Sequence, residues 1–268
     1  MKIAIITDIH GNSIALDAVL KDIDSNVDAY VFLGDFVAIG HDPVGVLERV
    51  SNLPNATFIR GNTDRYVTTP TYPPPSIADA QANPTLVPVI AEVARTFGWT
   101  QGAVTSAGWF KWLDSLPLEY RLTLPDGTKL LAVHAQPGQD EGAGMTPLHD
   151  NAYVRGVFGK GNANLIFVGH VHWAQDRQLE NLRVVNPGPV GNPHHPNLFA
   201  SYVLLSADSG GYDIEFRRVD YDRVAVIAEL DRLRHPGAEF IVKLLRGEKL
   251  PPWEDDQYNA ANAALFKR

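Results

Sequence analysis

Short apolar runs alternate with amphipathic segments near the start of the chain. The apolar runs have the length of buried strands, whereas the segments between them repeat apolar residues every three or four positions, as helices do. The strands are expected at residues 3–6, 29–33 and 56–60, and the helices at residues 13–24 and 43–52. Asn12 and Pro43 stand where an N-cap and a first helical turn would begin these helices. This order predicts a parallel α/β sheet.

The regular alternation ends after Asp64. A proline-rich loop at residues 68–75 is followed by residues 84–116, where Val, Ala, Phe and Trp recur in a pattern typical of two helices. The loop is expected to be a rigid connector that leaves the edge of the sheet. We therefore expect a helical cap, inserted at about residues 65–116.

Strand and helix patterns resume in the second half of the chain. Residues 118–124 and 129–133 form an expected hairpin around the turn Pro125-Asp126-Gly127. Further strands are expected at residues 165–168, 183–185, 199–205 and 213–218, and helices at residues 151–158, 223–233 and 239–245. Because the candidate site residues are spread from residue 8 to residue 172, we expect one domain over residues 1–246. A polar C-terminal tail is expected over residues 247–268.

Composition excludes several kinds of site. The 268 residues include no cysteine, which removes disulfides, thiolate nucleophiles, iron–sulfur clusters and thiolate zinc sites. The formal charge of -8 argues against nonspecific nucleic-acid binding, although bound cations would still admit a phosphate substrate. No apolar run has the length of a signal-peptide core or a membrane span, so we expect a cytoplasmic protein without membrane contact.

Seven side chains with nitrogen or oxygen donors follow the expected strands. They are Asp8, His10, Asp35, Asn62, His134, His170 and His172. The carboxyl ends of strands in an α/β sheet converge on one crevice, so these donors should lie together. Seven donors suffice for two metal ions that share a carboxylate, and the set suits Mn, Fe, Zn, Ni or Co better than calcium. His170 and His172 are expected to share one face of an extended segment.

The motifs around these residues resemble the five sequence blocks of the calcineurin-like metallophosphoesterases, in the same order. The blocks are Asp8-Ile9-His10, Gly34-Asp35, Gly61-Asn62-Thr63-Asp64, Val133-His134 and Gly169-His170-Val171-His172. Asp-x-His-Gly-Asn, Arg-Gly-Asn-x-Asp and Asn186-Pro187-Gly188 are similar to the small bacterial and archaeal phosphodiesterase branch. The resemblance implies an α/β fold in four layers, an α/β/β/α sandwich of two mixed sheets flanked by helices, here with a helical cap insertion.

The resemblance also implies a role for each donor. One metal ion would be bound by Asp8, His10 and His172, and the other by Asn62, His134 and His170, with Asp35 as a bridge. The implied cofactor is a pair of divalent ions, with manganese favoured, that bridges a hydroxide for attack on phosphorus. The implied catalytic residues are Asp35 and Asn62, and His41 is added to them as a candidate proton donor.

One position departs from the family pattern. Many members carry a histidine directly after the Gly-Asn pair, and that histidine is taken to protonate the leaving group. This chain has Thr63 there, and a hydroxyl is too weak an acid for this role near neutral pH. His41, His194 and His195 are candidate replacements. The candidate substrate-binding residues are Asn12, His41, Asn186, Gly188, His194 and His195, and Asp64 is expected to orient a ligand or cap a helix.

The leading functional hypothesis is hydrolysis of phosphodiesters or nucleoside polyphosphates, with a small phosphate ester or nucleotide as the substrate. A phosphatase of small phosphate monoesters is the alternative within the same chemistry. A non-catalytic metal-binding scaffold that docks a protein partner is the alternative from another class, and the presence of all seven donors disfavours it. The sequence leaves open the natural substrate, the native metal and whether the chain forms a homo-oligomer.

Overall fold

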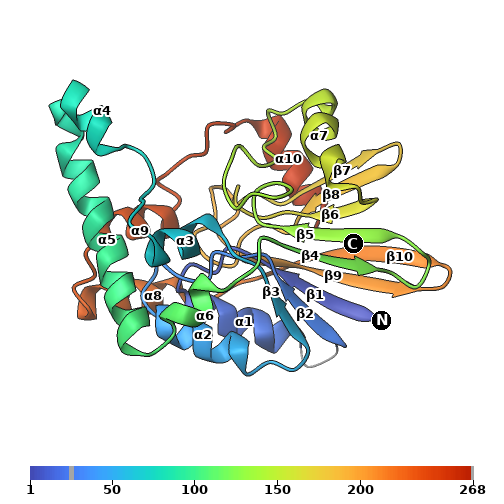
Figure 1. Cartoon of the computed structure of the whole chain (residues 1–268), viewed down its shortest axis with the longest axis horizontal. Helices are drawn as coiled ribbons and strands as arrows, with labels where there is room; N and C mark the ends of the chain where they lie inside the picture. Colours follow the sequence, from blue (N-terminus) through green and yellow to red (C-terminus); the bar gives the residue numbers. More distant parts are fainter. Residues whose placement is uncertain (24–26, 267–268) are drawn as a thin grey trace.

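Two five-stranded sheets pack face to face in the computed structural model of the chain, which describes residues 1–23 and 27–266 (Figure 1). The first sheet contains, in spatial order, β10 (Gly211–Val219), β9 (Ala200–Asp208), β1 (Lys2–Ile6), β2 (Ala29–Phe32) and β3 (Ala56–Phe58). The second contains β4 (Glu119–Thr123), β5 (Lys129–Val133), β6 (Leu165–Phe167), β8 (Leu182–Asn186) and β7 (Gln175–Leu179). Both sheets combine parallel and antiparallel pairs, which confirms the expected mixed-sheet sandwich.

The main core lies between the two sheets. Ile3 and Ile5 of β1 face the second sheet and join Leu130 and Phe167 in one apolar cluster. Ala4, on the opposite face of the same strand, belongs to the cluster beneath the outer helices. Because β1 is buried on both faces, its sequence is apolar without alternation.

Helices cover the outer face of each sheet and complete the four layers. The helices that pack in the cluster on the first sheet are α1 (Ser13–Ile23), α2 (Pro43–Ser51), α8 (Arg223–Arg232) and α9 (Ala238–Leu245). The second sheet is covered by α7 (Asn151–Phe158), whose Val154 and Phe158 pack on Leu131 and Ile166. Asp24, the last residue of the first expected helix, lies outside the described residues.

The segment after β3 is a helical insertion on one side of the sandwich. It contains α3 (Asn62–Thr68), α4 (Ile77–Ala82), a 3₁₀ turn (Pro84–Leu86), α5 (Val87–Ser106) and α6 (Phe110–Asp114). Figure 1 shows α5 at the left edge of the molecule, with α4 projecting beyond it. The apolar pattern does not predict α3 and α4, because both are too short to show a helical repeat.

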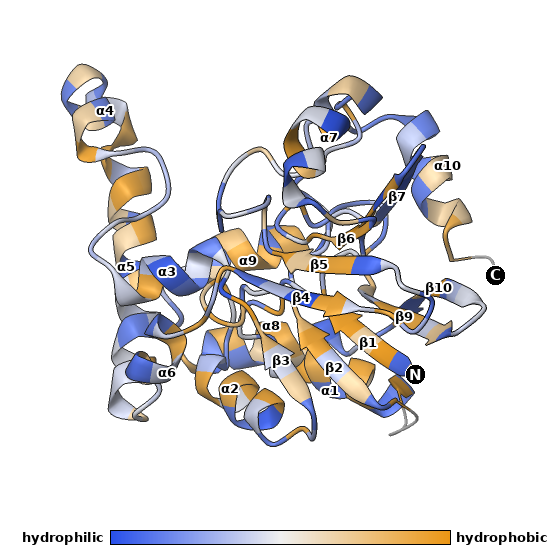
Figure 2. Cartoon of the chain, turned by 45° about the vertical axis from the view of Figure 1, so that its right-hand side comes forward, coloured by the Kyte–Doolittle hydropathy of each residue, from blue (hydrophilic) through white to orange (hydrophobic). Residues whose placement is uncertain are grey.

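The polar strand β7 is also absent from the sequence expectation. It is an edge strand with the sequence Gln-Asp-Arg-Gln-Leu, so it can be polar, and Asp176 in it forms an ion pair of 2.7 Å with Arg183 of β8. Figure 2 shows β7 in blue, in contrast to the orange inner strands. In the described part of the chain, no helix has both the length and the apolar character that crossing a membrane requires.

Residues 247–268, expected to be a polar tail, instead contain a packed helix. This is α10 (Asp256–Ala264), from which the Asn262 side chain donates to the backbone oxygen of Ala174 at 2.9 Å. Ahead of it, the buried Trp253 packs edge-on against Trp173, with 6.1 Å between ring centroids. The helix is only weakly amphipathic, so its sequence has no clear helical repeat and resembles that of a polar tail.

Two glycines allow the carboxyl ends of β2 and β3 to touch. Gly34 has a φ of +94°, and a Cβ at this position would overlap the backbone nitrogen of Gly61. A Cβ at Gly61 would in turn overlap the backbone of Asp35. The two strand ends can therefore be this close only with glycine at both positions, and the contact brings Asp35 next to Asn62.

We expect Gly34→Ala to destabilise the fold by about 2–4 kcal/mol, because the new methyl group adds steric overlap to an unfavourable φ. The matched control is Gly98→Ala in α5, where a Cβ meets no neighbouring atom. This control should stabilise the protein by about 0.5–1 kcal/mol, since alanine restricts the unfolded chain more than glycine. Chemical denaturation measures both changes, and equal stabilities of the two variants would contradict the proposed strand contact.

Candidate metal centre

The seven expected donors lie together at one edge of the sandwich. Asp8 and His10 follow β1, Asp35 follows β2, and Asn62 begins α3. The histidines at positions 134, 170 and 172 follow β5 and β6 of the other sheet. Because the parallel strands of both sheets end at this edge, residues more than 160 positions apart in sequence come within hydrogen-bond distance.

Most of the donors have a left-handed backbone conformation. The five concerned, with φ between +50° and +69°, are Asp8, His10, Asp35, His170 and His172. This conformation is uncommon for residues other than glycine and costs about 1–3 kcal/mol each. The spacing of His170 and His172 predicts that they share a face of an extended segment, but their left-handed backbone prevents this. Instead the two side chains enter different halves of the cluster.

The first half of the cluster contains Asp8, His10, Asp35 and His172. Their donor atoms all lie within 4.8 Å of one another. The Nε2 atoms of His10 and His172 are 2.9 Å apart, and the Nε2 of His10 is 3.5 Å from Asp35 Oδ2. Asp8 Oδ1 lies 3.5 Å from His172 Nε2. All four donor atoms thus surround a position for one ion.

The second half is formed around the Asn62 amide. Asn62 Oδ1 lies 3.0 Å from His134 Nε2 and 2.9 Å from His170 Nδ1. His134 Nε2 is also 3.4 Å from Asp35 Oδ2. The Asp35 oxygen that faces His10 therefore also faces His134, which places it between the two halves.

Backbone carbonyl groups fix the proton positions of three histidines. His134 Nδ1 lies 2.7 Å from Leu33 O, and His172 Nδ1 lies 2.8 Å from Asn192 O. His170 Nε2 lies 2.9 Å from Gly142 O. A carbonyl oxygen can only accept, so each of these ring nitrogens donates a proton, and the other nitrogen presents a lone pair to the cluster whenever the ring is neutral. Lone pairs that face one another at about 3 Å are stabilised by a cation, so the donor set fits divalent metal ions.

Charge in the cluster is balanced by its histidines. Although burial acts in the opposite direction, Asp35 raises the pKa of His134 to about 10, and His134 holds the pKa of Asp35 well below its usual range. Burial lowers the pKa of His10 to about 4, so this ring is neutral near pH 7. Without an ion, His134 carries a second proton on Nε2, beside Asp35. A bound ion would displace this proton.

Asp64 supports the Asp35 loop from behind. Its carboxylate accepts the backbone N–H groups of Asp35 at 2.8 Å, Phe36 at 2.9 Å and Gly61 at 2.9 Å. The expectation that Asp64 orients a ligand or caps a helix is confirmed by these contacts. Burial and the nearby Asp35 carboxylate raise the pKa of Asp64 to about 7, whereas the N–H groups favour its ionised form.

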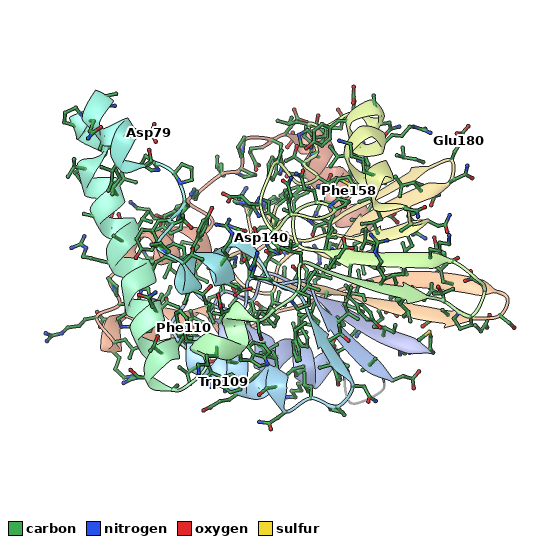
Figure 3. The ribbon with its side chains drawn as sticks, viewed as in Figure 1. Asp79, Trp109, Phe110, Asp140, Phe158 and Glu180 are labelled. Carbon is green, nitrogen blue, oxygen red and sulfur yellow. The ribbon has the colours of Figure 1, made fainter. Side chains whose placement is uncertain are left out.

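A salt-bridge network connects α3 to the loop at residues 140–142, which in turn contacts the His170 side chain. Asp140 is buried and accepts from Arg60 Nε at 2.8 Å and Arg65 Nε at 3.1 Å. Two residues along the chain, Gly142 provides the oxygen that accepts from His170. Asp140 lies near the centre of the molecule, between the cap helices and the second sheet (Figure 3). The sequence does not predict this network, because Asp140 lies 75 to 80 positions from its partners and belongs to no motif.

Four residues predicted to act on substrate make structural contacts in the protein. Asn12 is buried and caps α1, since its Oδ1 accepts from Ala15 N–H at 3.1 Å. Asn186 donates to Gly169 O at 2.8 Å and accepts from Gly188 N–H at 2.9 Å, so both residues form a buried turn behind the metal-centre loop.

His41 is the fourth of these residues. Its ring is buried beside α8, with Nε2 3.3 Å from Ser13 Oγ, and it lines a cavity with Glu229 and Arg232 rather than the metal cluster. Its position in the loop after Asp35 suggests proximity to the cluster, but the loop turns the ring toward α8.

Of the three histidines considered as proton donors, His194 borders the cluster. Its ring centroid is 6.0 Å from that of His172. Burial, His172 and Lys249 lower the pKa of His194 to about 4. His195, the adjacent residue, instead pairs with Glu254 at 3.4 Å.

We expect Asp140→Asn to weaken binding of an ion in the Asn62 half by about 10–100-fold, because a neutral amide cannot hold Arg60 and Arg65 against the Gly142 loop. Manganese titration with counting of bound ions measures this change. Asp176→Asn is the matched control, since it removes an ion pair with Arg183 away from the cluster. Equal affinity for two ions in both variants would show that the network does not position His170.

Comparison with known proteins places this centre in a family. Residues 1–210 match the family model described as the calcineurin-like phosphoesterase superfamily domain. The chain is 31% identical over 241 residues to an uncharacterized protein of Methanocaldococcus jannaschii, which covers 82% of this chain and 88% of that protein.

Two solved structures share the fold over nearly the whole chain. A metallophosphoesterase from Sphaerobacter thermophilus has a TM-score of 0.70 and 25% identity, covering 93% of this chain and 100% of that one. A hypothetical protein from Pyrococcus horikoshii OT3 has a TM-score of 0.76 and 22% identity, covering 91% and 97%. Together with the converging donors, the match over most of the chain shows that this protein belongs to the calcineurin-like phosphoesterase superfamily.

Proposed function

We propose that the chain is a dinuclear metal-dependent hydrolase of phosphodiesters or nucleoside polyphosphates. The observation that carries this proposal is the position of Asp35 Oδ2, which lies 3.5 Å from His10 Nε2 in one half of the cluster and 3.4 Å from His134 Nε2 in the other. A carboxylate in this position can be shared by two ions. The first ion is then bound by Asp8, His10 and His172, and the second by Asn62, His134 and His170.

Two divalent ions in such a site would supply an activated water as the nucleophile and would stabilise the phosphoryl oxygens. The residues of the chain hold this arrangement in place. Thr63 N–H donates to Asp35 Oδ1 at 2.8 Å, which leaves Oδ2 free to face both halves. Asn62 contributes an amide oxygen, and therefore adds no negative charge that would repel a phosphate. The mixed oxygen and imidazole donors suit Mn, Fe, Ni, Zn or Co, of which we favour manganese.

The position of Thr63 supports a preference for substrates with good leaving groups. Thr63 is buried, and its hydroxyl donates to the backbone oxygen of Val37 at 3.1 Å, so it cannot protonate a leaving group. His194 borders His172, but its lowered pKa leaves it neutral near pH 7. Phosphoanhydrides and diesters with aryl or nucleotidyl leaving groups need less protonation than alkyl monoesters, which favours the diesterase over the monoester phosphatase. The convergence of all seven donors favours a hydrolase over a non-catalytic docking scaffold.

We expect Asp35→Asn to reduce the number of bound ions below two and to lower turnover by on the order of 10³-fold, since the shared negative charge is lost. Metal analysis and hydrolysis of bis(p-nitrophenyl) phosphate with Mn²⁺ measure the two effects. Asp17→Asn is a control, because Asp17 is an exposed partner of Arg49. An Asp35→Asn protein with two ions and normal turnover would contradict the proposed bridge.

The rate of the wild-type protein should depend steeply on the pKa of the leaving group. A positioned general acid contributes about 10²–10⁴-fold, mostly to substrates with poor leaving groups, so its absence penalises alkyl esters. A series of aryl and alkyl esters of one phosphate measures the slope. Thr63→His should improve alkyl substrates selectively, whereas Thr63→Val should not. A flat dependence in the wild type would indicate a hidden proton donor, and His194→Gln would then identify it by steepening the slope.

A further inference from the structure

An apolar cavity lies between the helical insertion and α9. Its volume is about 320 Å³, within the range of small-molecule sites. The residues that form most of its wall are Pro74, Val89, Val93, Phe97, Phe240 and Ile241. The proline loop thus closes one side, α5 a second and α9 a third. The exposed Tyr72 extends the aromatic surface, since its ring centroid is 5.8 Å from that of Phe97.

One wall of the cavity is continuous with the metal centre. Ile39 lines the cavity, and its backbone oxygen accepts from the Asn192 side chain at 3.0 Å. The Asn192 backbone oxygen in turn accepts from His172 at 2.8 Å. Gly40, directly after Ile39, packs so closely on the His10 backbone that a Cβ would overlap it. The segment that forms the cavity wall therefore also positions two donors of the first half.

Lys249 forms a second link between the cavity and the metal centre and carries a positive charge. Lys249 lines the cavity, and its ammonium group is 4.2 Å from the Phe240 ring centroid. It lies close enough to His194 to lower that pKa, and His194 borders His172. Within residues 1–23 and 27–266, no carboxylate forms an ion pair with Lys249. The cavity therefore combines apolar, aromatic walls with two charged residues, Glu92 and Lys249, of which Lys249 lies beside His194.

We propose that this cavity binds the aromatic arm of the substrate, of the nucleobase or aryl type, while Lys249 faces the anionic phosphate. The inference rests on the proposed function, because it assumes that phosphorus lies at the metal cluster. Phe97 and Phe240 line the cavity, and burial of a flat aromatic group against such apolar walls stabilises the complex. A methyl arm would leave the cavity unfilled.

Two esters with the same leaving group test the proposal. They are thymidine 5′-(p-nitrophenyl phosphate) and methyl p-nitrophenyl phosphate, which differ only in the arm that remains on phosphorus. We expect the wild type to favour the thymidine ester in kcat/KM. Val89→Trp fills the cavity and should reduce this preference by about tenfold. The control is Val87→Trp, an exposed position on the same helix that does not line the cavity, which should keep the wild-type ratio.

Binding of thymidine 5′-monophosphate, measured by calorimetry with Mn²⁺, separates failure of this inference from failure of the proposed function. If both esters are hydrolysed and Val89→Trp keeps the wild-type ratio, the cavity proposal is overturned while the hydrolase stands. If neither ester is hydrolysed but Val89→Trp binds the nucleotide more weakly than Val87→Trp does, the cavity is supported and the hydrolase is not. Absence of both hydrolysis and selective binding overturns both proposals.

Discussion

Electron-pair donors repel one another when they are buried together, and the edge of this sandwich holds seven of them. The fold resists this repulsion through its backbone. Carbonyl groups of Leu33, Gly142 and Asn192 hold the imidazole rings, and left-handed φ angles at five donors direct the side chains inward. The glycine contact between β2 and β3 brings Asp35 to Asn62. Each device costs conformational freedom or strain, which the large core between the sheets offsets.

The donors themselves can be predicted from sequence because each follows directly on a strand. A buried parallel strand has a distinct apolar pattern, so the residue at its carboxyl end is placed without knowledge of the tertiary structure. Position after a strand does not determine the surroundings of His41 and Asn12. Both lie within a few residues of a donor, but α8 covers one and α1 uses the other as its cap. A residue close in sequence to a donor has its backbone near the centre, but this does not determine the direction of its side chain.

Other features depend on pairs that no local pattern reveals. Asp140 meets Arg60 and Arg65 only after the insertion has folded between them, and Asp140 itself belongs to no motif. The edge strand β7 and the helix α10 are polar enough to resemble a loop and a tail. Their order comes from contacts with distant segments, as in the bond from Asn262 to Ala174. Tertiary packing overrides weak local preference in both cases.

The pairing of β1 with β9 has a consequence for the synthesis of the protein. β1 carries Asp8 and His10 at its end, yet its antiparallel neighbour begins only at Ala200. While the ribosome produces the intervening segment, β1 has no partner on that side. The middle strand of the first sheet therefore behaves as an exposed edge during this time. The N-terminal donors emerge first, but the strand that precedes them gains its second neighbour only from β9. The sheet around these donors is therefore complete only after β9 has been synthesised.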